Sequence, residues 1–336
     1  MQFLSSKPPF KVNKPLFSVI LANTLLSTVP GISGAGPSPM KTVFTPILDS
    51  ELILNGRITS SKHKPNTPTG CPTPAIITRS MMEMTGLDPL FINAGLTSTP
   101  TVPCLDLYGA PGQDPRSGDA VLEIQELYAR GKWTGRLLSR CSDLLVLGEC
   151  VPGGTTTALC VLRGFGYEAR VSSSFISNPV GLKEEVCRAV VERLSSIPDR
   201  EPLDVVRCGG DPMIAVAAGI ASTYDGDLVL AGGTQMLAVA AVLKAMEKEL
   251  PPIATTVYVR DDPTATFAKT AADLGVTTYY VDPEFGDLGH PGLARYCIGE
   301  VKEGIGAGGA MMLAHLMGHS PEEIRKKILA VAGGYT

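Results

Sequence analysis

From about residue 88 onward, short apolar runs alternate with longer segments of helical character, and this alternation limits the folds that the chain can adopt. Short runs rich in Val, Leu and Ile are typical of buried strands. We expect strands at 89–93, 143–147, 203–207, 227–231, 255–260 and 276–281. We expect helices at about 119–140, from 155, at 181–196, from 212, from 234 and at 264–274. Strands that alternate with helices form parallel sheets. We therefore predict an α/β fold, a doubly wound, mainly parallel sheet with helices on both faces.

The first part of the chain has a different character, because prolines recur there and favour extended and turn conformations over helix. Within it, 17–22 is predicted to be a core strand. This stretch loosely resembles the apolar part of a signal peptide, but it is short, β-branched and followed by Asn23. Residues 75–78 are the other piece expected to be ordered. We predict a disordered or extended end (1–15), a smaller irregular or helical N-terminal subdomain (16–88) and the α/β domain (89–336).

Charge and composition exclude several classes of partner. The formal net charge is −4, and no long basic run is present to neutralise nucleic-acid phosphates. No run of 18 apolar residues is present, so no membrane-spanning helix is expected. The eight cysteines lack C-x-x-C spacing and are predicted to be mostly buried, reduced thiols rather than zinc ligands. We expect a cytoplasmic enzyme with small-molecule substrates, no metal and no cofactor.

Three of the expected strands run into glycine-rich turns. In a parallel sheet such turns lie at one edge, where ligands bind. Glycine lets the backbone approach a ligand closely, and the free amides at a helix N-terminus attract an anion. Tight strand–helix packing explains a single such turn more often than ligand binding does, but three turns at one edge predict a site for a phosphate-bearing ligand. The turn residues are Gly148, Gly153, Gly154, Thr155 and Thr156, then Gly209, Gly210 and Asp211, then Gly232 and Gly233.

A fourth segment, 301–310, places Glu303 beside Gly304 and Gly306 at the start of an apolar helix. A carboxylate at that position can accept a proton from a substrate held at the sheet edge. Alternatively, Glu303 only complements the dipole of the helix, which is the commoner role of an acidic residue in a first turn. The local sequence leaves both interpretations open.

Together these segments resemble, in order, the signatures of nicotinate-nucleotide–dimethylbenzimidazole phosphoribosyltransferases. Residues 148–156 are similar to the family's G-E-M-G-I-G-N-T-T, with Val151 in place of a glycine and Gly154 in place of the asparagine. The further matches are 209–219 with G-G-x-E-I-A-A-x-A-G, 303–307 with E-G-S-G-A, and 91–118 with the V-D-x-G and R-x-x-G stretch. The resemblance covers residues 89–318.

The resemblance implies transfer of 5-phosphoribose from nicotinate mononucleotide to a benzimidazole-type base, a step in assembling the lower ligand of cobamides (cobalamin biosynthesis). It implies that Glu303 is the general base and that Glu149 is a polar partner near the ribose or base. It implies that the 5′-phosphate binds at Gly153, Gly154, Thr155 and Thr156, with the other turn glycines and Asp211 around the substrate. It also implies a homodimer.

Other interpretations remain. No part of 1–85 matches the segment with which the family binds the acceptor base. Transfer to a different acceptor base is therefore one alternative. A non-catalytic sensor that binds a nucleotide without turnover is the alternative function.

The segment Arg260–Asp262 is similar to the paired-acid loop of transferases that use pyrophosphorylated ribose. Those enzymes need glycines where Phe267 and Ala268 stand, so Asp262 is predicted to belong to a turn. The letters G-x-G-x-x-G occur at 304–309, but no strand is expected directly before them, so the fingerprint of a Rossmann dehydrogenase is absent.

Overall fold

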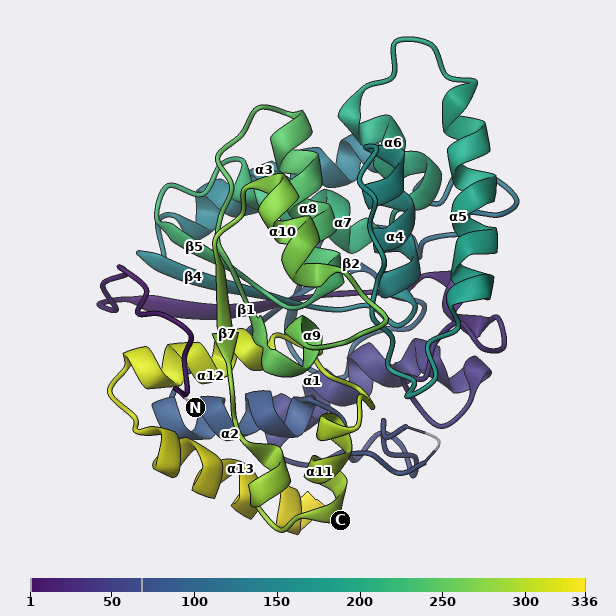
Figure 1. Ribbon diagram of the computed structural model, residues 1–336. Helices are drawn as coiled ribbons and strands as arrows, with labels where there is room; N and C mark the ends of the chain where they lie inside the picture. Colours follow the sequence, from purple (N-terminus) through teal and green to yellow (C-terminus); the bar gives the residue numbers. More distant parts are fainter. Residues whose placement is uncertain (1, 68, 336) are drawn as a thin grey trace.

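The computed structural model describes residues 2–67 and 69–335. Seven strands form one parallel sheet in the order β3-β2-β1-β4-β5-β6-β7 (Figure 1). The strands are β1 Pro15–Ala22, β2 Leu90–Gly95, β3 Cys104–Asp106, β4 Leu144–Cys150, β5 Asp227–Ala231, β6 Ile253–Thr256 and β7 Thr278–Val281. The predicted α/β fold with a parallel sheet is confirmed.

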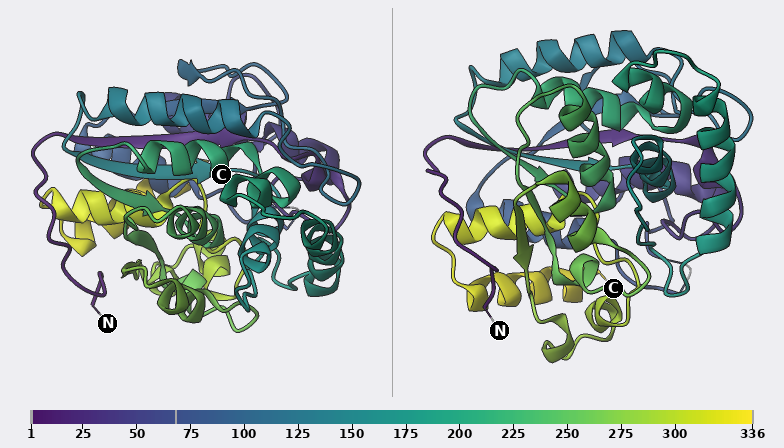
Figure 2. Two further views of the ribbon diagram at one scale, coloured as in Figure 1. Left: turned by 90° about the horizontal axis from the view of Figure 1, so that it is seen from above. Right: turned by 45° about the horizontal axis from the view of Figure 1, so that its top comes forward.

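Helices cover both faces of the sheet, and each face has its own hydrophobic core (Figures 1 and 2). Strand β1 alternates between them: Phe17, Val19 and Leu21 point to one core, Ile20 and Ala22 to the other. This is the period of two expected for a strand buried on both sides. One face carries α3 Ile124–Leu138, α4 Gly154–Gly164, α5 Val180–Ser195, α6 Pro202–Gly209, α7 Pro212–Ala221, α8 Thr234–Ala245 and α10 Phe267–Leu274. The other carries α1 Thr45–Asn55, α2 Ala75–Thr85, α11 Pro291–Cys297, α12 Ala307–Leu316 and α13 Pro321–Tyr335.

The N-terminal part contributes a central strand. β1 lies between β2 and β4, which confirms the core strand predicted at 17–22. Ahead of it, Phe3 and Leu4 are buried, and Leu4 forms an antiparallel bridge with Val281. The proline-rich stretch contains α1 and α2, because prolines are accommodated at or before the first helical turn. The predicted division at residue 88 stays a prediction.

The expected strand at 203–207 is wrong. These residues lie in α6, which begins with Pro202 at its first position. The Glu201 N–H donates to Asp204 Oδ2 at 2.8 Å, which caps this helix start. A run of five residues with three apolar members fits either a strand or one side of a helix. The proline and the acidic cap decide in favour of the helix.

The expected strand at 255–260 is also partly wrong. β6 ends at Thr256, and a single helical turn, α9 (Val257–Arg260), follows. Three short 3₁₀ segments complete the elements: η1 Leu25–Thr28, η2 Pro39–Phe44 and η3 Phe285–Asp287. The other predicted elements are present with boundaries shifted by a few residues.

Candidate functional site

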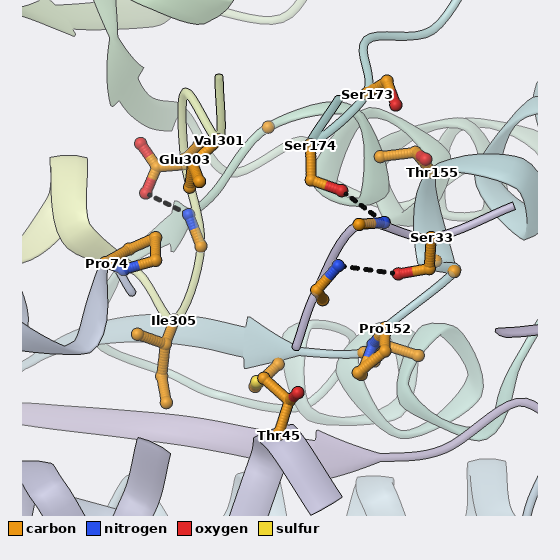
Figure 3. Close-up of a pocket in the computed structure, with 18 of the residues that line it drawn as sticks. Ser33, Thr45, Pro74, Pro152, Thr155, Ser173, Ser174, Val301, Glu303 and Ile305 are labelled. Carbon is orange, nitrogen blue, oxygen red and sulfur yellow. Dashed lines mark hydrogen bonds between the residues drawn. The ribbon is translucent and has the colours of Figure 1, made fainter. Parts of the chain in front are cut away.

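A pocket of about 120 Å³ opens at the carboxyl end of β4 (Figure 3). The strand order reverses between β1 and β4, since the chain first adds β2 and β3 on one side and then crosses to the other. Ligands of α/β proteins bind at such a reversal. The pocket walls come from the turn after β4, from α1, and from the segments 32–36, 172–174 and 301–305.

Half of the predicted site residues line this pocket. They are Glu149, Gly153, Gly154, Thr155, Gly233, Glu303 and Gly304. The others do not belong to its lining: Gly148, Thr156, Gly209, Gly210, Asp211, Gly232 and Gly306. The structure thus brings together the turn after β4 and the Glu303 segment, which are far apart in the sequence.

The turn after β4 has the geometry of an anion site. Gly153 has φ 80° and precedes α4, so the first amides of that helix face the pocket end of the turn. A Cβ at residue 153 would lie 3.1 Å from the Ser27 side chain. Thr155 adds a hydroxyl to this part of the pocket. Both the backbone conformation and the close contact therefore require glycine at 153.

A buried cation stands behind this turn. Lys183 of α5 is 1% exposed, and its Nζ donates to Thr155 Oγ1 at 3.1 Å and to the Ser172 carbonyl at 2.5 Å. Burial, followed by the nearby Lys302, lowers the pKa of Lys183 to about 7. The lysine therefore holds the Thr155 hydroxyl, which lines the pocket. Sequence reasoning missed it, because its partners are 11 and 28 residues away.

Gln235 takes the space next to Gly154. A Cβ at residue 154 would lie 2.6 Å from Gln235 Nε2. The same Nε2 donates to Glu149 Oε2 at 2.8 Å, and the Val151 N–H donates to this oxygen at 3.1 Å. Gln235 therefore accounts for the glycine at 154, where the resembling family has asparagine, and it fixes the Glu149 carboxyl.

The two pocket glutamates are electrostatically linked. Glu149 is 3% exposed, and burial, together with the charges of Asp211 and Glu303, raises its pKa to about 8. Burial also raises the pKa of Glu303 to about 7. Asp211 lies behind α4, where its carboxyl accepts a hydrogen bond from Thr157 Oγ1 at 2.6 Å. Carboxyls with such raised pKa values can exchange protons near neutral pH.

Glu303 is held by backbone amides at one oxygen and by a longer side-chain hydrogen bond at the other. Its Oε1 accepts from the Gly308 N–H at 3.0 Å. It also accepts from the Gly304 N–H at 3.3 Å, the hydrogen bond drawn at Glu303 in Figure 3. These amides lie at the start of α12, so Glu303 does interact with the helix N-terminus. Its Oε2 is 3.5 Å from Thr255 Oγ1. The carboxyl is thereby oriented, and Oε2, with the longer hydrogen bond, is the less tightly held of its two oxygens.

The segment that carries Glu303 has an unusual backbone. Val301 (φ 68°), Lys302 (φ 84°) and Ile305 (φ 46°) lie in the left-handed region, which residues other than glycine seldom adopt and β-branched residues such as Val301 and Ile305 adopt most rarely. Lys302 fixes it, because its Nζ donates to the Ser173 carbonyl at 2.7 Å and pairs with Asp262 at 3.3 Å. Asp262 is also in the predicted turn, accepting from the Thr264 N–H at 2.9 Å. Strain of this kind persists where the surroundings hold it, and it is typical of functional sites.

Gly148 and Gly306 bring the Glu303 segment to the sheet. A Cβ at residue 148 would lie 3.1 Å from Gly306 Cα. Gly306 has φ 72° and precedes α12. These two glycines therefore allow α12 to pack closely on β4, and neither of them lines the pocket.

The second glycine pair does not follow a strand. Because 203–207 is helical, Gly209 and Gly210 join α6 to α7. A Cβ at residue 209 would lie 2.5 Å from Val190, which explains the glycine by packing. Asp211 caps α7 by accepting from the Ile214 N–H at 3.2 Å.

Sequence reasoning also missed the wall that α1 contributes. Asp49 and Thr45 of this helix line the pocket, as does Thr73. Burial raises the pKa of Asp49 to about 7. These residues lie in the segment that has no match to the resembling family, and their contact with β4 spans about a hundred residues of sequence.

Over residues 2–67 and 69–335, no group of His, Cys, Asp and Glu side chains is arranged to hold a metal ion. Within the same ranges, no helix has the length and apolar character needed to cross a membrane.

Five of the eight cysteines are buried and all eight are free thiols, whereas Cys141 and Cys297 are exposed.

Comparison with known proteins places the chain in a family. No protein-family model matches it. A UPF0284 protein of Thermococcus onnurineus is 45% identical over 321 residues, which cover 94% of this chain and 96% of the relative. The chain belongs to the UPF0284 family. A second UPF0284 protein, from Methanosarcina acetivorans, is 42% identical over 339 residues, or 98% of this chain and 97% of the relative.

The UPF0284 fold is shared with solved structures. CobT from Thermus thermophilus matches with a TM-score of 0.63 and 16% identity, covering 97% of this chain and 87% of that one. Nicotinate-nucleotide–dimethylbenzimidazole phosphoribosyltransferase from the same organism matches with a TM-score of 0.62 and 15% identity, covering 95% and 84%. The resemblance found in the sequence is therefore confirmed at the level of the fold.

Proposed function

We propose that this protein is a phosphoribosyltransferase that moves 5-phosphoribose from nicotinate mononucleotide to a benzimidazole-type base, in the assembly of a cobamide lower ligand. One observation carries the proposal. The N-terminal turn of α4, with Gly153 and Thr155, and the carboxyl of Glu303 line the same pocket, although 150 residues separate Gly153 from Glu303. The shared fold with a protein of that activity agrees with it.

The 5′-phosphate binds at the turn before α4. The free amides of the helix start and the Thr155 hydroxyl donate to the phosphate oxygens. Lys183 sits behind Thr155 at 3.1 Å and adds positive charge at this end. In the structure, the segments 32–36 and 172–174 meet across this part of the pocket, where the Gly34 N–H donates to Ser174 Oγ at 3.0 Å (Figure 3). A pocket of about 120 Å³ is smaller than typical ligand sites, so nucleotide binding separates these two segments.

Bond exchange takes place at C1′ of the ribose. The bond from C1′ to the pyridinium nitrogen breaks, and its electron pair goes to that nitrogen, which releases nicotinate with a neutral ring. A ring nitrogen of the acceptor base forms the new bond to C1′. The proton on the acceptor's other ring nitrogen passes to Glu303 Oε2, the oxygen that is not held by the helix amides.

Glu149 stabilises the reacting centre. Its carboxyl is fixed by Gln235 and by the Val151 amide and lines the pocket next to the phosphate turn. Burial raises its pKa to about 8, so part of the molecules carry it ionised at neutral pH, and in these it places negative charge near the positive charge that develops at C1′. We further propose that the active protein is a homodimer located in the cytoplasm.

The test is release of nicotinate. The protein is incubated with nicotinate mononucleotide and a panel of benzimidazoles and purines, and free nicotinate is measured by chromatography. We expect base-dependent release with formation of the riboside phosphate. Thermal stabilisation by the nucleotide without nicotinate release from any base would instead support a nucleotide sensor, and it would overturn the transferase.

A further inference from the structure

The pocket contains a third carboxyl that the transfer does not use. Asp49 of α1 is 3% exposed and lines the pocket together with Glu149 and Glu303. Its Oδ1 accepts from Thr73 Oγ1 at 2.7 Å, and the Cys150 thiol lies 3.7 Å from its Oδ2. Among the described residues, no Lys, Arg or His side chain belongs to the pocket lining. A buried carboxyl with one hydroxyl and a weak thiol as donors has capacity for a further hydrogen bond.

A hydroxyl without a partner lies one helical turn away. Thr45 is 5% exposed, and its Oγ1 is buried with no hydrogen-bond partner in the part of the chain that the structure describes. Residues 45 and 49 are four apart on α1, so they share one face of the helix. An unpaired buried hydroxyl is unfavourable, and a polar ligand group would relieve this.

The α1 wall also has space beside it. A second cavity of about 440 Å³ shares Thr45 and Pro65 with the central pocket. Figure 3 shows Thr45 and Glu303 on different sides of the pocket, with Ser174 and Thr155 at a third side. A flat ligand with its reacting nitrogen at Glu303 therefore has a separate polar wall available for another of its edges.

We propose that Asp49 and Thr45 select the acceptor, and that the acceptor is a heteroaromatic base with a hydroxyl or amino group on the edge away from its reacting nitrogen. This inference rests on the proposed function and names the substrate class of the same site. The O–H or N–H of the substituent donates to the Asp49 carboxyl, and Thr45 Oγ1 bonds to the same group. A methyl group in that place leaves both polar side chains unpaired.

These hydrogen bonds should make the site discriminate between acceptor bases with and without a polar substituent. Sites built to hydrogen-bond a substrate group reject an analogue that lacks it more strongly than apolar pockets reject an added methyl group. We expect 5-hydroxy- and 5-aminobenzimidazole to exceed 5,6-dimethylbenzimidazole in kcat/KM for nicotinate release by about tenfold or more.

Two variants test the assignment. Thr45→Val removes the hydroxyl, and Asp49→Leu removes the carboxyl at similar volume. Each is expected to lower the hydroxy-to-dimethyl ratio of kcat/KM by about tenfold. Because the Thr45 hydroxyl has no partner, Thr45→Val is expected to fold normally even where Asp49→Leu does not. Thr85→Val is the matched control. Its hydroxyl bonds to the Met81 carbonyl on α2, outside the pocket lining, and its ratio should equal that of the unchanged protein.

A binding measurement separates this inference from the transferase proposal. Each base is titrated calorimetrically into the protein, with and without nicotinate mononucleotide. A Thr45-dependent preference for the polar bases, without nicotinate release, would overturn the transferase and support the selectivity. Equal affinities for the polar and dimethyl bases, a ratio unchanged in Thr45→Val, or no binding of any base would overturn the selectivity, whether or not nicotinate is released.

Discussion

Glu303 binds the backbone through one oxygen and faces Thr255 with the other. This division of the carboxyl has a chemical consequence. The amides at the start of α12 fix the orientation of the side chain, and burial keeps its pKa near neutrality, at about 7. A base of this pKa is ionised in a large fraction of molecules at neutral pH and still takes up a proton readily.

For the variant Glu303→Gln we expect nicotinate mononucleotide to bind with nearly unchanged affinity and kcat to fall by about tenfold or more, because an amide cannot accept the proton. In the unchanged protein, kcat should rise with pH through about 7 as Glu303 ionises. Steady-state rates between pH 5.5 and 8.5, with calorimetric binding of the nucleotide, measure both.

Glu322→Gln is the control for this variant, since Glu322 is exposed on α13. It should retain the rate and the pH profile. A Glu303→Gln protein with an unchanged rate would remove Glu303 as the base.

The residues found from the sequence and those missed differ in a physical way. Gly153 and Glu303 stand in local patterns, a strand followed by a glycine turn and an acid before a helix, which a sequence displays directly. Asp49 and Lys183 carry no such pattern, because their roles depend on burial and on partners that the fold brings together. The pocket end formed by the turn before α4 was therefore predictable, whereas the α1 wall was not.

At the scale of elements, the packing of α12 on β4 positions the Glu303 segment. Gly148→Ala is expected to destabilise the protein by about 1–3 kcal/mol, because the added Cβ would lie 3.1 Å from the Gly306 backbone and α12 would have to move. Chemical unfolding measures the change in the free energy of unfolding, and the nicotinate assay measures the accompanying loss of rate.

Gly181→Ala is the matched control for this packing. A Cβ at residue 181 would meet no atom within 4 Å, and the residue lies in α5. Alanine should be neutral or slightly stabilising there. Equal effects of the two substitutions would contradict the role of close contact at Gly148.

Element types were predictable where the apolar run was bounded clearly. Glycine-containing turns follow the strands β4 and β5, and the positions of these strands follow from the sequence. The error at α6 arose because 203–207 is too short for periodicity to separate a strand from a helix. The error removed one of three expected strand-to-helix turns, and the pocket is lined by residues of the other two turns and of α1.

At the scale of the whole molecule, buried acids make stability depend on pH. Burial raises the pKa of Glu149 to about 8, of Glu303 and Asp49 to about 7, and of Asp211 to about 6. Between pH 5 and 7 the folded protein thus binds more protons than the unfolded chain, so the free energy of unfolding should fall as pH rises. Lys183, whose pKa is lowered to about 7, acts with the opposite sign above pH 7.

Glu149→Gln tests this expectation. It removes one carboxyl whose pKa is raised by burial. The free energy of unfolding should therefore decline less steeply between pH 5 and 7, by about 1 kcal/mol per pH unit. Urea unfolding at several pH values measures the slopes. Identical slopes for Glu149→Gln and the unchanged protein would show that Glu149 is ionised in the folded state.

The strand order also bears on how the molecule can assemble during synthesis. β1 leaves the ribosome first and lies inside the sheet, with β2 and then β3 added on one flank and β4 to β7 added in turn on the other. Every later strand therefore meets a neighbour that already exists, and none has to insert between two formed strands. The nascent chain can extend its sheet strand by strand, in the order in which the message is read.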